Sequence, residues 1–191
     1  MCAGLMPLLK RVNWQQFDSK TGGFSVEFPA KPRKEMSLRS LKTNPSFKVE
    51  GTYLWNRGEE YAILYRDIDS ARQRDCDNTV AFKLAVNELV AAGLQVKGDS
   101  TELEKNGFST REYKFTSSHG GTYSALVVVA DTRMYILLVG GQSTHPDGNN
   151  VHYFFNSFNV TNEGLIKGEE RGRVACLGKL LTEASFKLIG K

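Results

Sequence analysis

The sequence predicts one α+β domain, a three-layer α/β/α sandwich whose mostly antiparallel sheet has about six to eight strands with helices on both faces. A length of 191 residues suits a single domain with its own core. Most runs between residues 14 and 141 alternate with period two or are apolar throughout, whereas two segments change to the helical period. We expect residues 1–12 to be a flexible segment or leader remnant, 13–160 the sandwich domain, and 161–191 a linker with a short amphipathic helix.

Two runs near the N-terminus predict a β-hairpin. "WQQF" and "FSVEF" are separated by the polar turn "DSKTGG", and the second run places Phe24, Val26 and Phe28 on one face. Pro29 and Pro32 end this strand, because proline has no N–H to donate to a neighbouring strand. A second hairpin is predicted further along, where "FKVEGTYLW" and "EYAILYRDI" flank the turn "NRGE".

The chain then changes period, and "NTVAFKLAVNELVAAG" predicts an amphipathic helix. We expect Asn78 or Thr79 to cap its start and Gly93 to end it. The expected buried stripe consists of Val80, Leu84, Ala85, Glu88 and Leu89.

Four further runs predict a meander of four strands: "LQVKGDSTELEKN", "FSTREYKFTSS", "TYSALVVVAD" and "MYILLVGGQ". The cores of the last two, "ALVVVA" and "YILLVG", are apolar on both faces, which is typical of central strands covered on both sides. The second cover is predicted in "PDGNNVHYFFNSF", with Asp147 or Asn149 as its cap. Its apolar stripe is Val151, Phe154, Phe155 and Phe158.

Beyond residue 160 the composition changes again. "TNEGLIKGEERGR" is charged and rich in glycine, which predicts a linker, and "VACLGKLLTEASFKL" has helical spacing of its apolar residues. We expect this last helix to pack on the domain or to meet a partner.

The formal charge of +4 is concentrated near the N-terminus, where residues 1–50 hold nine basic side chains against four acidic ones. A solvated edge that prevents aggregation is the simpler interpretation of this excess, and a contact with an acidic partner is the functional one. Three scattered cysteines indicate reduced thiols rather than a disulfide framework. No run reaches the roughly 18 to 20 apolar residues of a membrane span, so we expect a soluble chain. A cytoplasmic and an extracytoplasmic location both stay open.

The most enzyme-like stretch is "LLVGGQSTHPDG", in which Ser143 and His145 follow an apolar strand. A nucleophile elbow needs a small residue at the position that His145 occupies, which favours a polar loop before a helix. A small-molecule or hydrolytic site around Ser143 and His145 remains an alternative. We expect no metal site and no cofactor, because the histidines and the "DCD" run at 75–77 lack a spacing that would complete a metal's ligand set.

The order of elements points to a family. "W..F.S..GGFSVEFPAKP", the hairpin ending in "YAILYRDI", one central helix, the apolar meander and the closing "YFFNSF" together resemble the PsbP-like superfamily over residues 13–160. That group shares its α/β/α sandwich with the Ran-binding import factor of the Mog type and with bacterial domains of unknown function. The resemblance implies that the "FSVEFP" strand lies in the sheet. It also implies a non-catalytic module for binding or assembling another protein.

Two surfaces are candidates for this partner contact. One is a face of the sheet near the 140–150 loop, and the other is the basic stretch 31–48. Nucleic-acid binding through the basic stretch is a weaker alternative, because no known reader motif accompanies it. The residues expected to contact the partner are Lys31, Arg33, Lys34, Arg39 and Lys42.

Overall fold

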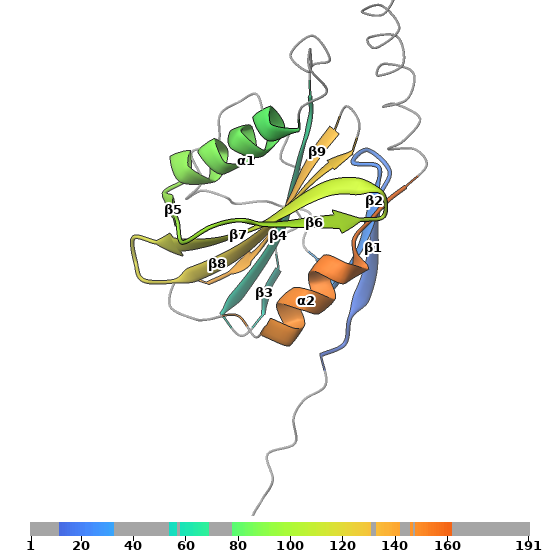
Figure 1. Ribbon diagram of the computed structural model, residues 1–191. Coiled ribbons are helices and arrows are strands. Elements are labelled where there is room, and N and C mark those ends of the chain that lie inside the picture. The colour runs from blue at the N-terminus through green and yellow to red at the C-terminus, as the bar shows by residue number, and fades with distance from the viewer. Residues whose placement is uncertain are drawn as a thin grey trace, which may run out of the picture.

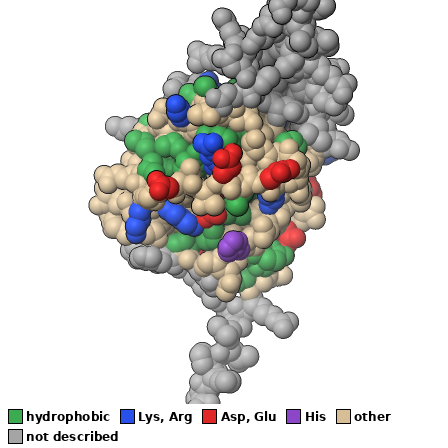
Figure 2. Space-filling view, in the orientation of Figure 1, with side chains coloured by type: hydrophobic (Ala, Val, Ile, Leu, Met, Phe, Trp, Pro, Cys, Tyr) green, Lys and Arg blue, Asp and Glu red, His purple; other side chains and the backbone are tan. Residues whose placement is uncertain are grey.

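A seven-stranded antiparallel sheet forms the middle layer of the described part of the chain (Figure 1). This computed structural model describes residues 12–32, 54–56, 58–68, 78–130, 133–141, 146 and 148–161. Helix α1 covers one face of the sheet, and helix α2 together with a small three-stranded sheet covers the other. The face turned to the viewer carries charged side chains of both signs among apolar ones (Figure 2). Because both faces of the main sheet are covered, the predicted three-layer sandwich is confirmed.

The order of strands in the large sheet is β3-β4-β9-β8-β7-β5, and β6 also pairs with β7. As predicted, β8 and β9 are central, and nearly all of their side chains are buried. The first strand expected in the meander forms two strands instead, separated by a bend in which Gly98 has a φ of 73°. The strands are β3 (Leu54–Asn56), β4 (Glu59–Asp67), β5 (Leu94–Val96), β6 (Thr101–Lys105), β7 (Phe108–Ser117), β8 (Thr122–Ala130) and β9 (Arg133–Gly140).

Helix α1 (Thr79–Ala91) begins and ends where the sequence predicts, and Gly93 follows it with a φ of 94°. The predicted stripe is partly wrong. Val80 is 49% exposed and Leu84 is only half-buried. In the first turns of the helix, Ala81 and Phe82 are buried against the sheet in place of Val80 and Leu84. Its buried residues are Ala81, Phe82, Ala85, Glu88 and Leu89.

Asn78 occupies the N-cap position, but its side chain makes no capping hydrogen bond. Its backbone has helical angles (φ −66°, ψ −9°), whereas a capping side chain needs an extended backbone to reach the free N–H groups. The amide Nδ2 donates instead to Ser109 Oγ at 2.9 Å. Asn78 therefore ties the start of α1 to β7.

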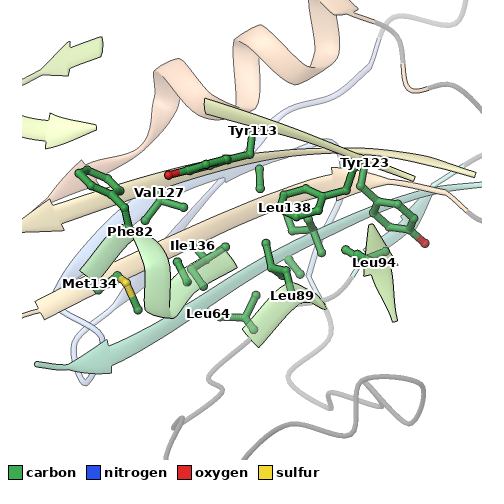
Figure 3. Packing of buried hydrophobic residues seen from close by; sticks show 14 of the residues in the cluster. Leu64, Phe82, Leu89, Leu94, Tyr113, Tyr123, Val127, Met134, Ile136 and Leu138 are labelled. Atoms are coloured by element: carbon green, nitrogen blue, oxygen red, sulfur yellow. The ribbon is translucent and has the colours of Figure 1, made fainter. Parts of the chain in front are cut away.

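The core under α1 is formed by side chains from alternate positions of the central strands. Figure 3 shows Phe82 and Leu89 of the helix with Val127, Ile136 and Leu138 of the strands. These residues are at most 2% exposed. Their burial against an uninterrupted apolar sheet is the main attachment of α1.

The opposite face is covered by α2 (Gly148–Ser157) and by a three-stranded sheet of order β1-β2-β10. The predicted N-terminal hairpin forms, with Phe24, Val26 and Phe28 buried. It does not lie in the main sheet, however, which corrects what the resemblance implied. The apolar face of β2 packs against the main sheet and α2, and its two edges pair with β1 and β10. The three strands are β1 (Gln15–Ser19), β2 (Phe24–Phe28) and β10 (Asn159–Val160).

The stripe predicted for α2 is confirmed, since Val151, Phe154 and Phe155 are buried in the helix and Phe158 is buried just after it. Asp147, one of its two expected caps, and the predicted C-terminal helix lie outside the described residues. The second hairpin is confirmed for the part described, where β3 pairs with β4. Within the described ranges, neither helix is long and apolar enough to cross a membrane.

Candidate functional site

A half-open cleft of about 520 Å³ lies between the β7–β8 strands and the first turns of α2. Its size falls within the roughly 300 to 1,000 Å³ of pockets that bind small ligands or side chains. Apolar side chains of α2, among them Val151 and Phe155, line one side of it. The polar residues of its lining are Lys97, Glu112, Lys114, Thr122, Ser124 and His152.

The cleft forms where the α2-facing side of the sheet changes from apolar to polar. Along β8, Val128 and Leu126 lie in the core beneath α2, and Ser124 and Thr122 follow on the same side of the strand. On β7, the register pairs Lys114 with Ser124. The polar ends of both strands therefore extend past the core, and the start of α2 forms the facing wall.

Lys114 organises the floor of the cleft. Its Nζ donates to Glu112 Oε1 at 2.5 Å and to Ser124 Oγ at 3.0 Å. The Ser124 side chain is buried, whereas the Lys114 side chain is 54% exposed. The ammonium group is thus held by partners from its own strand and from β8 while it stays accessible from the cleft.

Lys97 stands at the rim, directly after β5. Its backbone N–H donates to Lys114 O at 2.8 Å, which attaches this segment to β7. The Lys97 side chain is exposed and makes no ion pair within the described residues. Across the cleft, His152 is exposed on α2. Figure 2 shows this mixture of basic, acidic and histidine side chains over α2 and the neighbouring strands.

The residues proposed from the sequence are mostly not placed. Lys31 is described and exposed, whereas Arg33, Lys34, Arg39 and Lys42 lie outside the described residues. The same holds for Ser143 and His145. Both sequence-based sites therefore stay predictions.

The cleft adjoins one surface that the sequence did indicate, since Pro146 and Gly148 of the 140–150 segment line it. Lys97 and Lys114 were missed. The alternation of Lys114 with Tyr113 and Phe115 did show that it lies on a different face from these aromatics, but not which residues stand opposite it. Within the described ranges, no group of three histidine, cysteine or acidic residues is arranged to hold a metal ion.

No family model and no curated protein sequence matches this chain. A solved structure does, the solution structure of cyanobacterial PsbP (CyanoP) from Synechocystis sp. PCC 6803. The match covers 83% of this chain and 98% of that chain at 12% sequence identity, with a TM-score of 0.53. The fold is PsbP-like.

This PsbP-like fold confirms the resemblance drawn from the sequence, and at 12% identity the likeness concerns the fold alone. The crystal structure of the Ran-binding protein Mog1p from Saccharomyces cerevisiae also matches, over 81% of this chain and 98% of that chain, at 9% identity. Its TM-score of 0.43 is too low for the match to support any argument.

Proposed function

We propose that this chain is a non-catalytic module that binds another protein through the cleft between β7–β8 and α2. The observation that carries the proposal is the combination of an apolar wall with a charged rim, seen where Val151 and Phe155 face Lys97 and Lys114. Protein interfaces have this organisation, with an apolar centre that excludes water and polar groups around it. The resemblance to a superfamily of mostly binding and assembly factors supports the same class of function.

The basic stretch remains a second candidate contact. Lys31 is exposed two residues after the buried Pro29, so the chain leaves the small sheet at the molecular surface there. A partner with an acidic surface would be attracted to this stretch at long range, and such steering weakens with added salt. The two surfaces can be tested side by side.

The test is a pull-down from the lysate of the source, with bound proteins identified by mass spectrometry. Three variants accompany the wild type: Lys97→Glu in the cleft, the triple change of Lys31, Arg33 and Lys34 to Glu in the basic stretch, and Lys83→Glu as the control. Lys83 is an exposed lysine on α1, at the opposite face of the main sheet. The control thus makes the same charge change on the face of the main sheet opposite to the cleft.

We expect a reproducible set of proteins that the wild type and Lys83→Glu retain and that Lys97→Glu loses. Loss with the triple variant alone would move the contact to the basic stretch and show that the cleft is not the interface. Retention of one and the same set by all four proteins would contradict both surfaces.

A further inference from the structure

The charges of the described residues at the cleft do not balance. Lys97 and Lys114 contribute two ammonium groups, and the only carboxylate among the described residues of the lining, Glu112, is already bonded to Lys114 at 2.5 Å. Because Lys97 makes no ion pair within the described part of the chain, its charge is left over at the rim. A partly enclosed site with one excess positive charge favours an anionic group.

The polar atoms of the floor are mostly hydrogen-bond donors. The Ser124 hydroxyl accepts from Lys114 Nζ, so its own hydrogen is directed elsewhere and can be donated to a ligand. Gly148, the first residue of α2, also lines the cleft, and the start of a helix carries partial positive charge. Donors from β8, from Lys97 and from the start of α2 therefore surround one space. A carboxylate, which only accepts hydrogen bonds, matches this set.

The apolar wall indicates what carries the carboxylate. A small free acid would occupy only part of about 520 Å³ and would leave the rest of the cleft, with the small accessible part of Val151 and Phe155, in water. An acidic and an aliphatic side chain two positions apart on an extended peptide point to the same side, so they would cover the wall and reach the lysines together. The added apolar contact contributes affinity in proportion to the area that it covers.

We infer that the cleft receives an acidic residue and an aliphatic residue two positions along from it, both from an extended segment of the partner protein. This inference rests on the proposed function and names the chemistry of the partner. The carboxylate lies between Lys97 and Lys114 and accepts from Ser124, and the aliphatic side chain packs on Val151 and Phe155 of α2. Reversing the charge of Lys97 turns the excess of one positive charge among the described residues into an excess of one negative charge, without touching the Lys114–Glu112 pair.

The test is a titration of the ¹⁵N-labelled chain, followed by the backbone amide signals in NMR spectra. The probe is the blocked peptide acetyl-GEAVAG-amide, which has its acidic and aliphatic side chains two positions apart, and acetyl-GQAVAG-amide is its neutral isostere. Succinate serves as a free dicarboxylate without the peptide. Lys97→Glu is the cleft variant and Lys83→Glu the control, and their spectra without peptide show that each is folded.

We expect the acidic peptide to shift the amide signals of Lys97, Ser124 and Gly148 in a saturable way, and to bind more weakly as salt is added. Lys97→Glu should weaken this binding about tenfold, as expected for reversing one partly screened charge beside a carboxylate. The control should bind like the wild type.

Equal binding of the neutral peptide would overturn the inference, because no charge would then be recognised. Binding of succinate as tightly as the acidic peptide would overturn the choice of a peptide segment and assign the cleft to a small free acid. Signals shifted only outside the cleft would also refute it. If the pull-down depends on Lys97 but the acidic peptide does not bind, the proposed function stands and only the chemistry named here is wrong.

Discussion

Arg133, the first residue of β9, joins the main sheet to the turn of the N-terminal hairpin. Its Nε donates to Asp67 Oδ1 at 2.7 Å, and its Nη1 donates to the backbone oxygens of Gly22 at 2.8 Å and Thr21 at 3.2 Å. The guanidinium carbon lies 5.0 Å from the centre of the Tyr65 ring. The side chain of Arg133, which is 8% exposed, thus satisfies a carboxylate of β4 and two carbonyls of the hairpin turn.

Replacing Arg133 by Met should destabilise the fold by about 2 to 4 kcal/mol, because the carbonyl of Gly22 loses its charged donor and the half-exposed Asp67 loses its partner. Arg133→Lys keeps the charge but lacks the planar set of donors, so its free energy of unfolding should lie between those of the wild type and of Arg133→Met. The measurement is the free energy of unfolding in urea. An Arg133→Met protein as stable as the wild type would show that this contact is dispensable.

Lys105, the last residue of β6, connects that strand to α2. Its Nζ donates to the carbonyl of Phe155 near the end of the helix, and burial lowers the pKa of Lys105 from 10.5 to about 8. At pH values between about 8 and 10.5, the side chain of Lys105 is protonated in the unfolded chain and deprotonated in the folded chain. Stability should therefore rise with pH across this interval because of Lys105, and the gain is lost as pH falls to about 8.

Replacing Lys105 by Gln should remove this part of the pH dependence. The quantity to compare is the free energy of unfolding at pH values from about 7.5 to 10.5, measured for wild type, Lys105→Gln and Lys83→Gln. Because Lys83 is exposed, its variant should follow the wild-type slope. Parallel curves for all three proteins would refute the assignment to Lys105.

At the scale of elements, β8 and β9 approach closely where the register pairs Tyr123 with Gly140. A Cβ atom on Gly140 would overlap the ring of Tyr123 and lie 2.7 Å from Thr122 O. Tyr123 is buried in the core beneath α1, so the ring has little room to move. Glycine at this position lets an aromatic side chain lie across the neighbouring strand.

Gly140→Ala should therefore destabilise the protein by about 1 to 3 kcal/mol, since either the ring or the strand must shift. Gly148→Ala is a matched control, because a Cβ there meets no atom within 4 Å. Thermal unfolding of the two variants provides the comparison. Equal melting temperatures for Gly140→Ala and wild type would contradict the predicted clash.

At the scale of the whole molecule, two separate cores share the same central strands. Side chains of β8 and β9 point alternately to the core under α1 and to the core under α2 and the small sheet. The edges of the sheets are occupied by short strands, among them Leu54–Asn56 and Asn159–Val160. The middle of the molecule is therefore stabilised from both sides and the edges from one.

This arrangement predicts a gradient of hydrogen exchange. Backbone amides of β8 and β9 should exchange only through global unfolding, whereas those of β3 and β10 should exchange through local opening at much lower free energy. Native-state exchange followed by mass spectrometry or NMR measures both. Amides of β9 that exchange as fast as those of β10 would show that the two cores do not share one cooperative unit.

Much of this architecture follows from local patterns. The alternation of Phe24, Val26 and Phe28 predicted a strand with one buried face, and the uninterrupted apolar runs predicted the two central strands. Such patterns involve residues that are close in sequence, so they can be interpreted without knowing the packing. The error at Val80 marks the limit, because which positions of a helix are buried depends on the surface that receives it.

The sequence by itself determined which segments are strands or helices and which of their faces are apolar, because these properties depend on neighbouring residues and on the preference of apolar groups to leave water. Only the tertiary structure decided that the N-terminal hairpin forms its own sheet and that Lys97, Lys114 and His152 surround one cleft. These outcomes depend on strand register and on where α2 ends its cover of the sheet. Both are settled by contacts between segments far apart in the chain, where packing of whole surfaces outweighs local preference.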